Sequence, residues 1–521
     1  APAPWVPGSG DRPPWDDVAL SALVRRPGRR ERPALVLEGS VRTYGSLADG
    51  AGRLGGALAH RYGVQAGDRV ALSAKNCLGY LEAEIAIAEA AAVMVAMSWR
   101  YTDAERVDVL RRSGARVLLC DADMVSGVEA ARRRGELPEL HHVLRLCDAQ
   151  DGGHDDEEPL DARVPTPRAG HLADPHEIIY TSGTTGEPKG AVWTQGAVIW
   201  NSIQQAMDFG LGPTSSTYVA FDLNYIGGRH QFTWALLHQG GTVHLRRSGG
   251  FDAEEVLRYL SEKRITHVLW VPTMLYDILS VPTLPQFDLG HLEMIMCGGA
   301  PLSEAVIRQA QAAFPHTRVV QVYGLTEGGG TVTYVPPDDV HRKVGSAGLP
   351  SMHNMLRVVD SAGSPCAPGT TGEILVRGPA MTTGYWDDPE ATAAAVRDGW
   401  LWTGDLGHLD AEGFLYIDGR RKELIISGGM NIFPKEIEDV LRSHAGVRDA
   451  AVIGVPHERW GETVCAVVER VPGGTVDSQE LIAHCRERLA SYKKPTVVRF
   501  LPTLPRTLSG KVRKTELAAF V

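Results

Sequence analysis

The chain has 521 residues, of which 43% are hydrophobic and 22% are charged. This length exceeds what one hydrophobic core usually serves, and the composition is average for globular proteins, which excludes a single small module, a disordered chain and a fibrous protein. The 53 basic and 63 acidic residues give a net charge of −10 without a long basic stripe, so nucleic-acid binding has no electrostatic support.

The cysteines and the most apolar stretch bear on where the protein works. Seven cysteines are spread widely without a Cys-x-x-Cys pair, which disfavours a disulfide framework and a zinc cluster and fits a reducing cytoplasm. Residues 83–97 include Glu84 and Glu89 and fall short of the roughly 20 residues of a membrane helix, so no membrane insertion is expected. The start, APAPWVPGSG, lacks the basic and apolar regions of a signal peptide and is expected to form a loose arm.

From Tyr44 onward, helix-like and strand-like segments alternate. Helices are expected over 44–61 and from Leu78, and the apolar strands RVALSA, VMVAMS and RVLLC begin at Arg69, Val93 and Arg116. This rhythm predicts parallel βα units. The expected fold class is therefore α/β, with a large N-terminal domain of stacked βα subdomains.

Two changes of pattern suggest domain limits. Residues 147–168 are acidic and rich in Gly and Pro, which predicts an exposed connector between subdomains, without a function of its own. After Gly419 the elements become shorter, with a helix opened by Pro434 between strand-like segments, which predicts a compact α+β module. We expect an N-terminal domain over 1–418 and a C-terminal domain over 419–521.

The densest local signal is the segment YTSGTTGEPKG at 180–190, which follows a strand-like EIIY. Its glycines, hydroxyl groups and Lys189 can turn backbone N–H groups, hydroxyls and a cation toward a polyphosphate. The spacing of a Walker A loop is missing, and a polar surface turn is the alternative. The candidate polyphosphate-binding residues of this loop are Thr181, Ser182, Gly183, Thr184, Thr185 and Gly186.

Further motifs follow in order along the chain. They are GGAPL at 298–302, YGLTE at 323–327, TGEI at 371–374, GY at 384–385, TGD at 403–405, GR at 419–420, GGMNI at 428–432 and PRTLSGK at 505–511. From about Arg42 to Leu517 the chain thus resembles the adenylate-forming (ANL) superfamily, in its acyl-CoA synthetase branch. The resemblance implies ATP, Mg²⁺ and coenzyme A as cofactors, and a mobile C-terminal lid. It also implies that a carboxylic acid becomes acyl-AMP before its acyl group passes to CoA and AMP leaves.

The resemblance assigns the adenylation chemistry to four residues. Thr326 and Glu327 are implied to be catalytic, and the carboxylate of Glu327 is the kind of oxygen ligand that Mg²⁺ on a nucleotide requires. Lys189 and Lys511 are implied to supply positive charge, which the reaction needs because a carboxylate attacks an anionic phosphate. Without this context, a glutamate in a turn faces solvent and a lysine near a C-terminus is a solvated tail.

The resemblance also implies where adenosine binds. Asp405 suits the ribose hydroxyls, and Arg420 is a further donor to the nucleotide. The ring of Tyr323 is expected to face the adenine, with plain core packing as the alternative. The flat backbone on the other side of the base is expected from Gly299, Ala300 and Pro301.

Three positions are implied to serve the second half-reaction. Lys422 falls where the family places the hinge of its small domain, and a hinge needs residues that absorb a large change of φ and ψ. Gly428 and Gly429 would let the pantetheine arm of CoA approach the backbone closely. An ordinary turn between two strands is the alternative for this glycine pair.

The acyl pocket shows a departure from the family. Tyr225 stands where many members have His, shortly before Gly228, and both residues are expected to line the pocket. Downstream, Gly328, Gly329 and Gly330 lack side chains, which suggests room for a bulky, hydrophobic or polycyclic acid. The alternative is a loop that merely requires positive φ angles.

Other functions compete with an acyl-CoA synthetase. The acyl group could be loaded onto the phosphopantetheine of a carrier protein, although no carrier domain is fused to this chain. A non-catalytic nucleotide sensor is a second alternative, and the joint presence of Lys189, Glu327 and Lys511 argues against it. The expected partners are a small carboxylic acid, ATP and CoA, with monomer and homodimer both left open.

Overall fold

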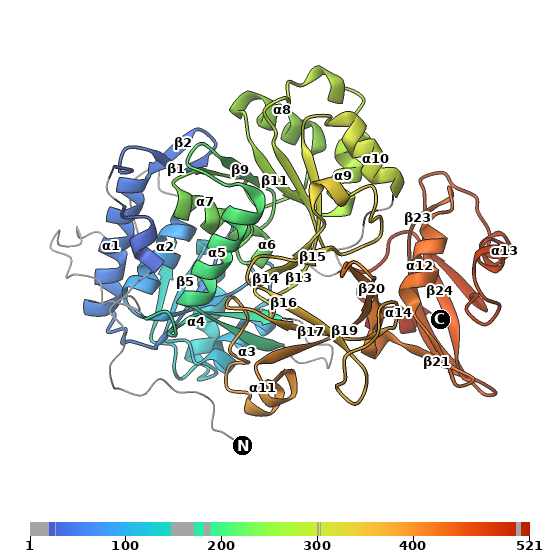
Figure 1. The fold of residues 1–521 in the computed structure, drawn as a ribbon. Coiled ribbons are helices and arrows are strands. Elements are labelled where there is room, and N and C mark those ends of the chain that lie inside the picture. Colours follow the sequence, from blue (N-terminus) through green and yellow to red (C-terminus); the bar gives the residue numbers. More distant parts are fainter. Residues whose placement is uncertain are drawn as a thin grey trace. The chain divides into compact units, whose positions relative to one another are not determined.

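The structure is a computed structural model (Figure 1), which describes residues 20–26, 28–146, 171–181, 188–299, 302, 304–506 and 512–520. The predicted N-terminal arm and the predicted connector at 147–168 lie outside the described residues. The chain divides into two compact units. The first comprises Ala1–Gly345, Pro350–Met355 and Arg377–Leu401, and the second comprises Ser346–Leu349, Leu356–Val376 and Trp402–Val521.

The first unit contains a six-stranded sheet in the order β6-β5-β3-β4-β7-β8. Neighbouring strands are parallel except β7 and β8, which pair antiparallel. The strands are β3 (Arg69–Ser73), β4 (Val93–Ala96), β5 (Val117–Cys120), β6 (His142–Arg145), β7 (Pro175–Thr181) and β8 (Lys189–Thr194). The parallel strands predicted near 69, 93 and 116 are therefore confirmed.

A second sheet, most of which lies in the first unit, runs in the order β15-β14-β13-β12-β11-β9-β10-β1-β2. Its central strands are parallel, and the outer pairs β1–β2 and β13–β14 are antiparallel. The strands are β1 (Pro33–Leu37), β2 (Ser40–Thr43), β9 (Ser216–Val219), β10 (Thr242–Leu245), β11 (His267–Trp270), β12 (Met294–Cys297), β13 (Arg318–Leu325) and β14 (Gly330–Tyr334). The short strands β15 (Leu349–Pro350) and β18 (Val396–Arg397) follow later in the chain.

Helices cover both faces of each of these sheets. They are α1 (Tyr44–His60), α2 (Leu78–Glu89), α3 (Asp103–Ser113), α4 (Ala122–Arg133), α5 (Gln195–Phe209), α6 (Ile226–Arg229), α7 (Thr233–Gln239), α8 (Ala253–Lys263), α9 (Pro272–Leu279), α10 (Glu304–Ala313) and α11 (Pro389–Ala395). Helices α1, α2, α5 and α7 share one hydrophobic core with strands of both sheets. Helices α3 and α4 cover the other face of the first sheet, and α8 to α10 cover the other face of the second.

The alternation of side chains along the strands explains this layering. Successive residues of a strand point to opposite faces of its sheet. On β3, Val70 and Leu72 contribute to the core between the two sheets, whereas Ala71 contributes to the core under α3 and α4. Both faces are apolar because both are covered, as expected for parallel sheets.

The second unit also contains two sheets. In one, β16 (Met355–Val359), β17 (Gly372–Arg377) and β19 (Trp400–Leu409) are neighbours, and β20 (Leu415–Arg420) pairs with β19. In the other, β22 (Met430–Ile432), β21 (Ile425–Ser427), β24 (Gly461–Arg470) and β23 (Val447–His457) lie in this order, and β25 (Val497–Leu501) pairs with β24. Its helices are α12 (Pro434–Arg442), α13 (Ser478–Arg488) and α14 (Lys514–Leu517). The helix predicted to open at Pro434 is confirmed.

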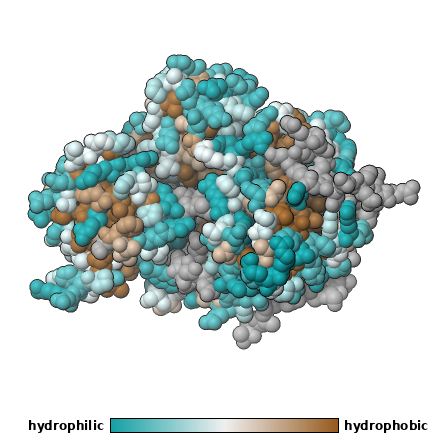
Figure 2. Space-filling view, turned by 180° about the vertical axis from the view of Figure 1, so that it is seen from behind, coloured by the Kyte–Doolittle hydropathy of each residue, from teal (hydrophilic) through white to brown (hydrophobic). Residues whose placement is uncertain are grey.

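The visible face in Figure 2 is largely hydrophilic, and its hydrophobic areas are small and separated by polar ones. Among the described residues, no helix combines the length and the apolar character needed to cross a membrane. The predicted domain boundary between residues 418 and 419 falls within the second unit. That the C-terminal domain pivots near this boundary stays a prediction.

Candidate active site

The turn that carries Glu327 is fixed by backbone hydrogen bonds. It connects β13 to β14, and within it the Gly328 N–H donates to the Leu325 carbonyl at 3.1 Å. The Trp193 indole N–H of β8 donates to the Thr326 carbonyl at 2.9 Å, and the Thr382 N–H donates to the Glu327 carbonyl, also at 2.9 Å. Because neighbouring segments hold its backbone, Glu327 has a defined position before any ligand binds.

Two side chains of the first unit contact this carboxylate, and Lys189 lies beside one of them. The hydroxyl groups of Thr181 and Tyr385 donate to Glu327 Oε1 at 3.3 and 3.1 Å. Lys189 faces Thr181 in the β7–β8 register, and its Nζ lies 5.4 Å from the centre of the Tyr385 ring. The strands that flank the expected phosphate loop therefore meet the Glu327 turn at their ends.

Tyr385 was part of a recognised motif, but the sequence did not predict a site role for it. Burial raises the pKa of Tyr385, and the negative charge of Glu327 and the hydrogen bond to it raise this pKa further. Its hydroxyl therefore stays protonated near neutral pH and acts as a donor. The hydroxyl groups of Tyr385 and Thr181 both donate to Glu327, which restricts the orientation of its carboxylate.

The carboxylates around Glu327 bear on where Mg²⁺ could bind. Among them, no group of three or more His, Cys, Asp or Glu side chains could hold a metal ion without help. Mg²⁺ is commonly held by one or two carboxylates together with substrate phosphates. A single partly buried carboxylate, Glu327, beside a phosphate loop fits this kind of site. When bound there, the ion would neutralise phosphate charge.

Two of the expected adenine-binding residues lie at one edge of the second sheet. Strands β12 and β13 are parallel, with Cys297 opposite Gln321. Gly299 and Tyr323 each follow this pair by two residues, so they lie at the same level past the carboxyl end of β12. Open α/β sheets bind ligands at this edge. Tyr323 is partly buried and Gly299 is exposed.

The second unit brings Asp405 and Arg420 together. They are opposite each other on β19 and β20, and Arg420 Nε lies 3.0 Å from Asp405 Oδ1. Asp405 is 4% exposed, and its N–H donates to Thr403 Oγ1 at 3.1 Å. The neighbouring Arg421 pairs with Glu373 at 2.6 Å. Their predicted roles toward the nucleotide stay predictions.

Gly428 and Gly429 form the turn of the β21–β22 hairpin. Ser427 pairs with Met430 across the hairpin, and both glycines have positive φ angles, +58° and +81°. A two-residue hairpin turn of this kind requires such angles, so the alternative of an ordinary turn explains both glycines. The predicted contact with CoA stays a prediction. Lys422 lies nearby in the chain, in the exposed 3₁₀ turn η5 (Arg421–Glu423).

Side chains at Gly328, Gly329 and Gly330 would meet closely packed neighbours. A β-carbon on Gly329 would lie 2.5 Å from the Ala380 carbonyl oxygen, and one on Gly330 would lie 2.8 Å from Gln231 Nε2. Gly329 and Gly330 have φ angles of +87° and +85°. Backbone geometry in a packed region is therefore enough to explain these glycines, and the predicted room for a bulky acid at this turn stays a prediction.

The other two expected pocket residues lie around α6. Tyr225 is the residue before the helix, and its hydroxyl lies 3.5 Å from Ser98 Oγ. Burial raises the pKa of Tyr225, and hydrogen bonds with Ser98 and Asn224 lower it in part. A side chain on Gly228 would collide with the Asp222 carbonyl. Tyr225 cannot serve as a base near neutral pH as a histidine could.

A fully buried charge cluster supports β7, and no local sequence pattern indicated it. Arg229 pairs with Glu177 of β7, and its Nε lies 3.3 Å from Glu84 Oε1 of α2. His176 Nε2 lies 3.1 Å from Glu84 Oε1, and His230 pairs with Glu177. Burial alone would raise the pKa of Glu177, but Arg229 and the two histidines lower it to about 2. Glu177 thus stays ionised opposite Arg229, and the cluster links β7, α2 and α6.

The buried amides of α5 support the turn on its other side. Asn201 Nδ2 donates to the Gly329 carbonyl at 2.5 Å, and Gln204 Nε2 donates to the Thr331 carbonyl at 2.8 Å. Polar residues on a core-facing helix were a possible sequence signal for this contact. Eight predicted site residues lie outside the described residues, namely Ser182, Gly183, Thr184, Thr185, Gly186, Ala300, Pro301 and Lys511.

Comparison with known proteins decides the family. Residues 24–386 match the family model described as AMP-binding enzyme, and residues 436–511 match the AMP-binding enzyme C-terminal domain. The chain belongs to the AMP-binding enzyme family. This confirms the resemblance to the adenylate-forming superfamily and its acyl-CoA synthetase branch.

Relatives agree over nearly the whole chain. Indoleacetate–CoA ligase of Aromatoleum aromaticum is 38% identical, with 92% of this chain and 93% of the relative covered. A Mycobacterium tuberculosis ligase that joins a methyl-dioxo-octahydro-indenyl propanoyl group to CoA is 36% identical, with 96% and 97% covered. The crystal structure of ATP-bound MatB from Rhodopseudomonas palustris matches with a TM-score of 0.88 and 30% identity, covering 97% of this chain and 99% of that one.

These matches establish the reaction class. The protein is an ATP-dependent acyl-CoA synthetase that acts through an acyl-AMP, and ATP, Mg²⁺ and CoA are its cofactors. A carboxylic acid, ATP and CoA are accordingly its small-molecule partners. The α/β fold predicted from the sequence is confirmed.

Proposed function

We propose that this acyl-CoA synthetase activates a bulky cyclic acid whose carboxyl group sits on a short chain. The observation that carries the substrate class is that relatives covering nearly the whole chain are named for an indole acetate and for an indenyl propanoyl group. In both names a ring system bears a short carboxylic chain. The inferred volume at the glycine turn gives no support, so the bulky-acid proposal rests on these relatives.

In the proposed adenylation step, the substrate carboxylate attacks the α-phosphorus of ATP, and the bond from that phosphorus to pyrophosphate breaks. Lys189 and Lys511 supply positive charge where the two anions meet. Glu327, held by Thr181 and Tyr385, and the adjacent Thr326 are placed to orient the phosphates. The convergence of these described groups at the ends of β7, β8 and β13 is the geometric support for this step.

The same proposal assigns the nucleoside and the rest of the loop. Tyr323 and the segment from Gly299 enclose the adenine, and Asp405 with Arg420 binds the ribose. The phosphates lie along the loop that follows Thr181. The parallel edge that carries Gly299 and Tyr323 supports this assignment, because ligands bind there in open α/β sheets.

In the proposed thioester step, the CoA sulfur attacks the acyl carbon of the acyl-AMP, and AMP leaves. The C-terminal domain over 419–521 pivots about Lys422 between the two steps and presents Gly428 and Gly429 to pantetheine. The exposed η5 turn and the exposed hairpin of Gly428 and Gly429 are compatible with these roles. Domain alternation of this kind lets one site serve two reactions.

A panel of acids tests the substrate proposal. Pyrophosphate release is measured with acetate, a long-chain fatty acid, benzoate, indole-3-acetate and a bicyclic propanoic acid. We expect the two ring acids with short carboxylic chains to give the highest kcat/KM. Preference for acetate or for the fatty acid would contradict the proposal and leave the reaction class intact.

The proposal extends to the acceptor, the compartment and the assembly. Free CoA is the acceptor, and a holo carrier protein supplied in its place should accept the acyl group poorly.

Six cysteines among the described residues are free thiols, which supports a cytoplasmic enzyme. The protein acts as a monomer or a homodimer, which sedimentation at two concentrations distinguishes.

A further inference from the structure

Two charged residues flank the segment that ends in Lys511. Arg506 precedes this segment and Lys514 follows it, and both lie in the second unit. The backbone at its two ends is joined, because Arg506 forms an isolated bridge with Val512 and the Arg513 N–H donates to the Pro505 carbonyl at 2.8 Å. Whatever fixes Arg506 and Lys514 therefore fixes the base of the segment.

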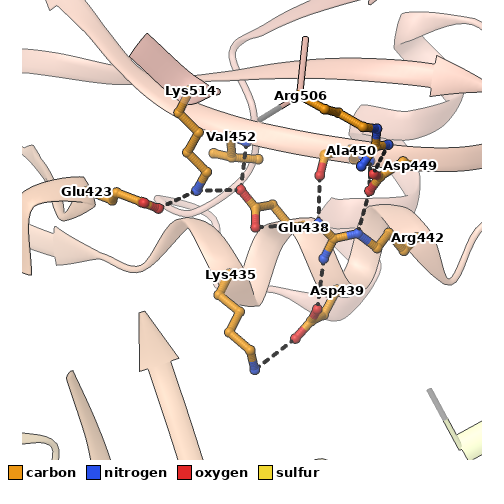
Figure 3. Close-up of polar contacts among 10 residues, drawn as sticks. All are labelled: Glu423, Lys435, Glu438, Asp439, Arg442, Asp449, Ala450, Val452, Arg506 and Lys514. Atoms are coloured by element: carbon orange, nitrogen blue, oxygen red, sulfur yellow. Dashed lines mark hydrogen bonds and ion pairs between the residues drawn. The ribbon is translucent and has the colours of Figure 1, made fainter. Parts of the chain in front are cut away.

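Arg506 is anchored on β23 (Figure 3). Its Nη2 lies 2.6 Å from Asp449 Oδ2, and the other Asp449 oxygen lies 2.8 Å from Arg442 Nε of α12. Burial alone would raise the pKa of Asp449, but the charges of Arg442 and Arg506 lower it. The carboxylate between two guanidinium groups is therefore ionised under ordinary conditions.

Lys514 joins three parts of the second unit (Figure 3). Its Nζ lies 2.6 Å from Glu423 Oε2 and 2.7 Å from Glu438 Oε1. Glu438 belongs to α12, is 6% exposed, and accepts the Val452 N–H at 2.9 Å. Glu423 directly follows Lys422 in the chain. One ammonium group thus connects the residue after the proposed hinge, the body of the domain and the segment of Lys511.

We propose that Lys514 is a positioning residue that couples the hinge to Lys511. By holding Glu423 against Glu438, it makes the chain after Lys422 part of the rigid body of the lid. Rotation at the hinge then moves the chain around Lys514, and with it Lys511 three residues earlier, as one rigid body. This inference rests on the proposed function, in which Lys422 is the pivot and Lys511 serves adenylation.

The arrangement of charges supports a mechanical role. The Lys514 side chain is only 20% exposed, so its two ion pairs are partly shielded from water and salt. Removing the cation would leave the buried Glu438 carboxylate with Arg442, whose Nη2 is 3.7 Å away, and would release Glu423. Glu438 would stay in place on α12, but η5 would lose the ion pair between Glu423 and Lys514.

The test measures both half-reactions of the full-length enzyme for Lys514→Met and Glu423→Gln. We expect acid-dependent pyrophosphate release to fall at least tenfold in kcat, with KM for ATP within threefold. Thioester formation from supplied acyl-adenylate should stay within threefold. Lys514→Arg should restore adenylation to within threefold of the wild type.

A matched ion pair controls for general effects. Lys493 lies 2.6 Å from Glu436 in the same unit, and its side chain is 19% exposed. Lys493→Met and Glu436→Gln should leave both half-reactions within twofold. Glu423→Gln keeps the test valid if Lys514→Met fails to fold, because the Glu423 side chain is 36% exposed.

The outcomes separate this inference from the proposed function. Adenylation within twofold of wild type in both Glu423→Gln and Lys514→Met, while Lys511→Ala abolishes it, would overturn the coupling role alone. Equal losses in both half-reactions, accompanied by a lowered melting temperature, would reduce Lys514 to a structural role and also overturn it. If Lys511→Ala leaves adenylation intact, the proposed function itself fails.

Discussion

Removal of one hydroxyl group tests the geometry of the adenylation site. Tyr385→Phe deletes the donor that lies 3.1 Å from Glu327 Oε1 and keeps the ring beneath Lys189. A hydrogen bond to a charged group contributes about 1.5–3 kcal/mol, which corresponds to roughly 10- to 150-fold in rate. Glu327 is partly exposed and retains the bond from Thr181 at 3.3 Å, so we expect the lower end, about tenfold.

The assay is acid-dependent pyrophosphate release at varied ATP and Mg²⁺ concentrations. The variant should lose about tenfold in kcat/KM and need more Mg²⁺ for half-maximal rate, while thioester formation from supplied acyl-adenylate is unchanged. Thr181→Ala should have a similar but smaller effect, and the double variant should deviate from additivity because both donors share one oxygen.

A matched control uses another partly buried tyrosine of the first unit. The Tyr259 hydroxyl lies 3.0 Å from His244 Nδ1. Tyr259→Phe should leave the rate and the Mg²⁺ dependence within twofold. If Tyr385→Phe behaves in the same way, the hydroxyl does not hold Glu327 for catalysis and the reasoning is refuted.

Three further predictions concern stability and the glycine turn. Arg229→Met leaves two buried carboxylates without their guanidinium and should destabilise the protein by about 3–5 kcal/mol in chemical unfolding, and an unchanged midpoint would contradict a charged cluster. Burial lowers the pKa of His244 to about 4, so the stability that its neutral ring contributes is present above about pH 6.5 and is lost as the pH falls through 4. His244→Gln should therefore reduce the loss of unfolding free energy in acid by up to about 3 kcal/mol. An equal loss of unfolding free energy in both proteins would argue against a buried neutral ring. Gly329→Ala should lower activity with every acid alike and by more than Gly345→Ala, which has a similar φ of +81° but open space, whereas a change of preference between small and large acids would support a pocket at this turn.

Much of the fold followed from local sequence patterns. The strand that begins at Arg69 and the helix that begins at Leu78 were predicted from apolar runs, because parallel strands buried on both faces are nearly continuous in hydrophobic residues. The motif at 323–327 lies at the end of β13 and in the turn that follows it, and the predicted role of Glu327 stays a prediction. Such features depend on neighbours within a few residues, which a single sequence displays directly.

What could not be predicted depends on residues far apart in the chain. Tyr385 lies 58 residues from Glu327, and Arg229 lies 52 residues from Glu177. No local period or spacing relates such pairs, because the topology of the sheets brings them together. The close packing at Gly329 has the same origin, since the Ala380 carbonyl that a β-carbon would meet belongs to a distant segment.

One measurement tests the central claim most directly. The purified enzyme is incubated with ATP, Mg²⁺ and indole-3-acetate or a bicyclic propanoic acid, first without CoA and then with it, and all products are identified by mass. We predict acyl-AMP and pyrophosphate in the first incubation, and acyl-CoA with AMP in equal amounts in the second. Formation of ADP and phosphate, or consumption of ATP that does not depend on the acid, would contradict a synthetase that acts through an acyl-adenylate.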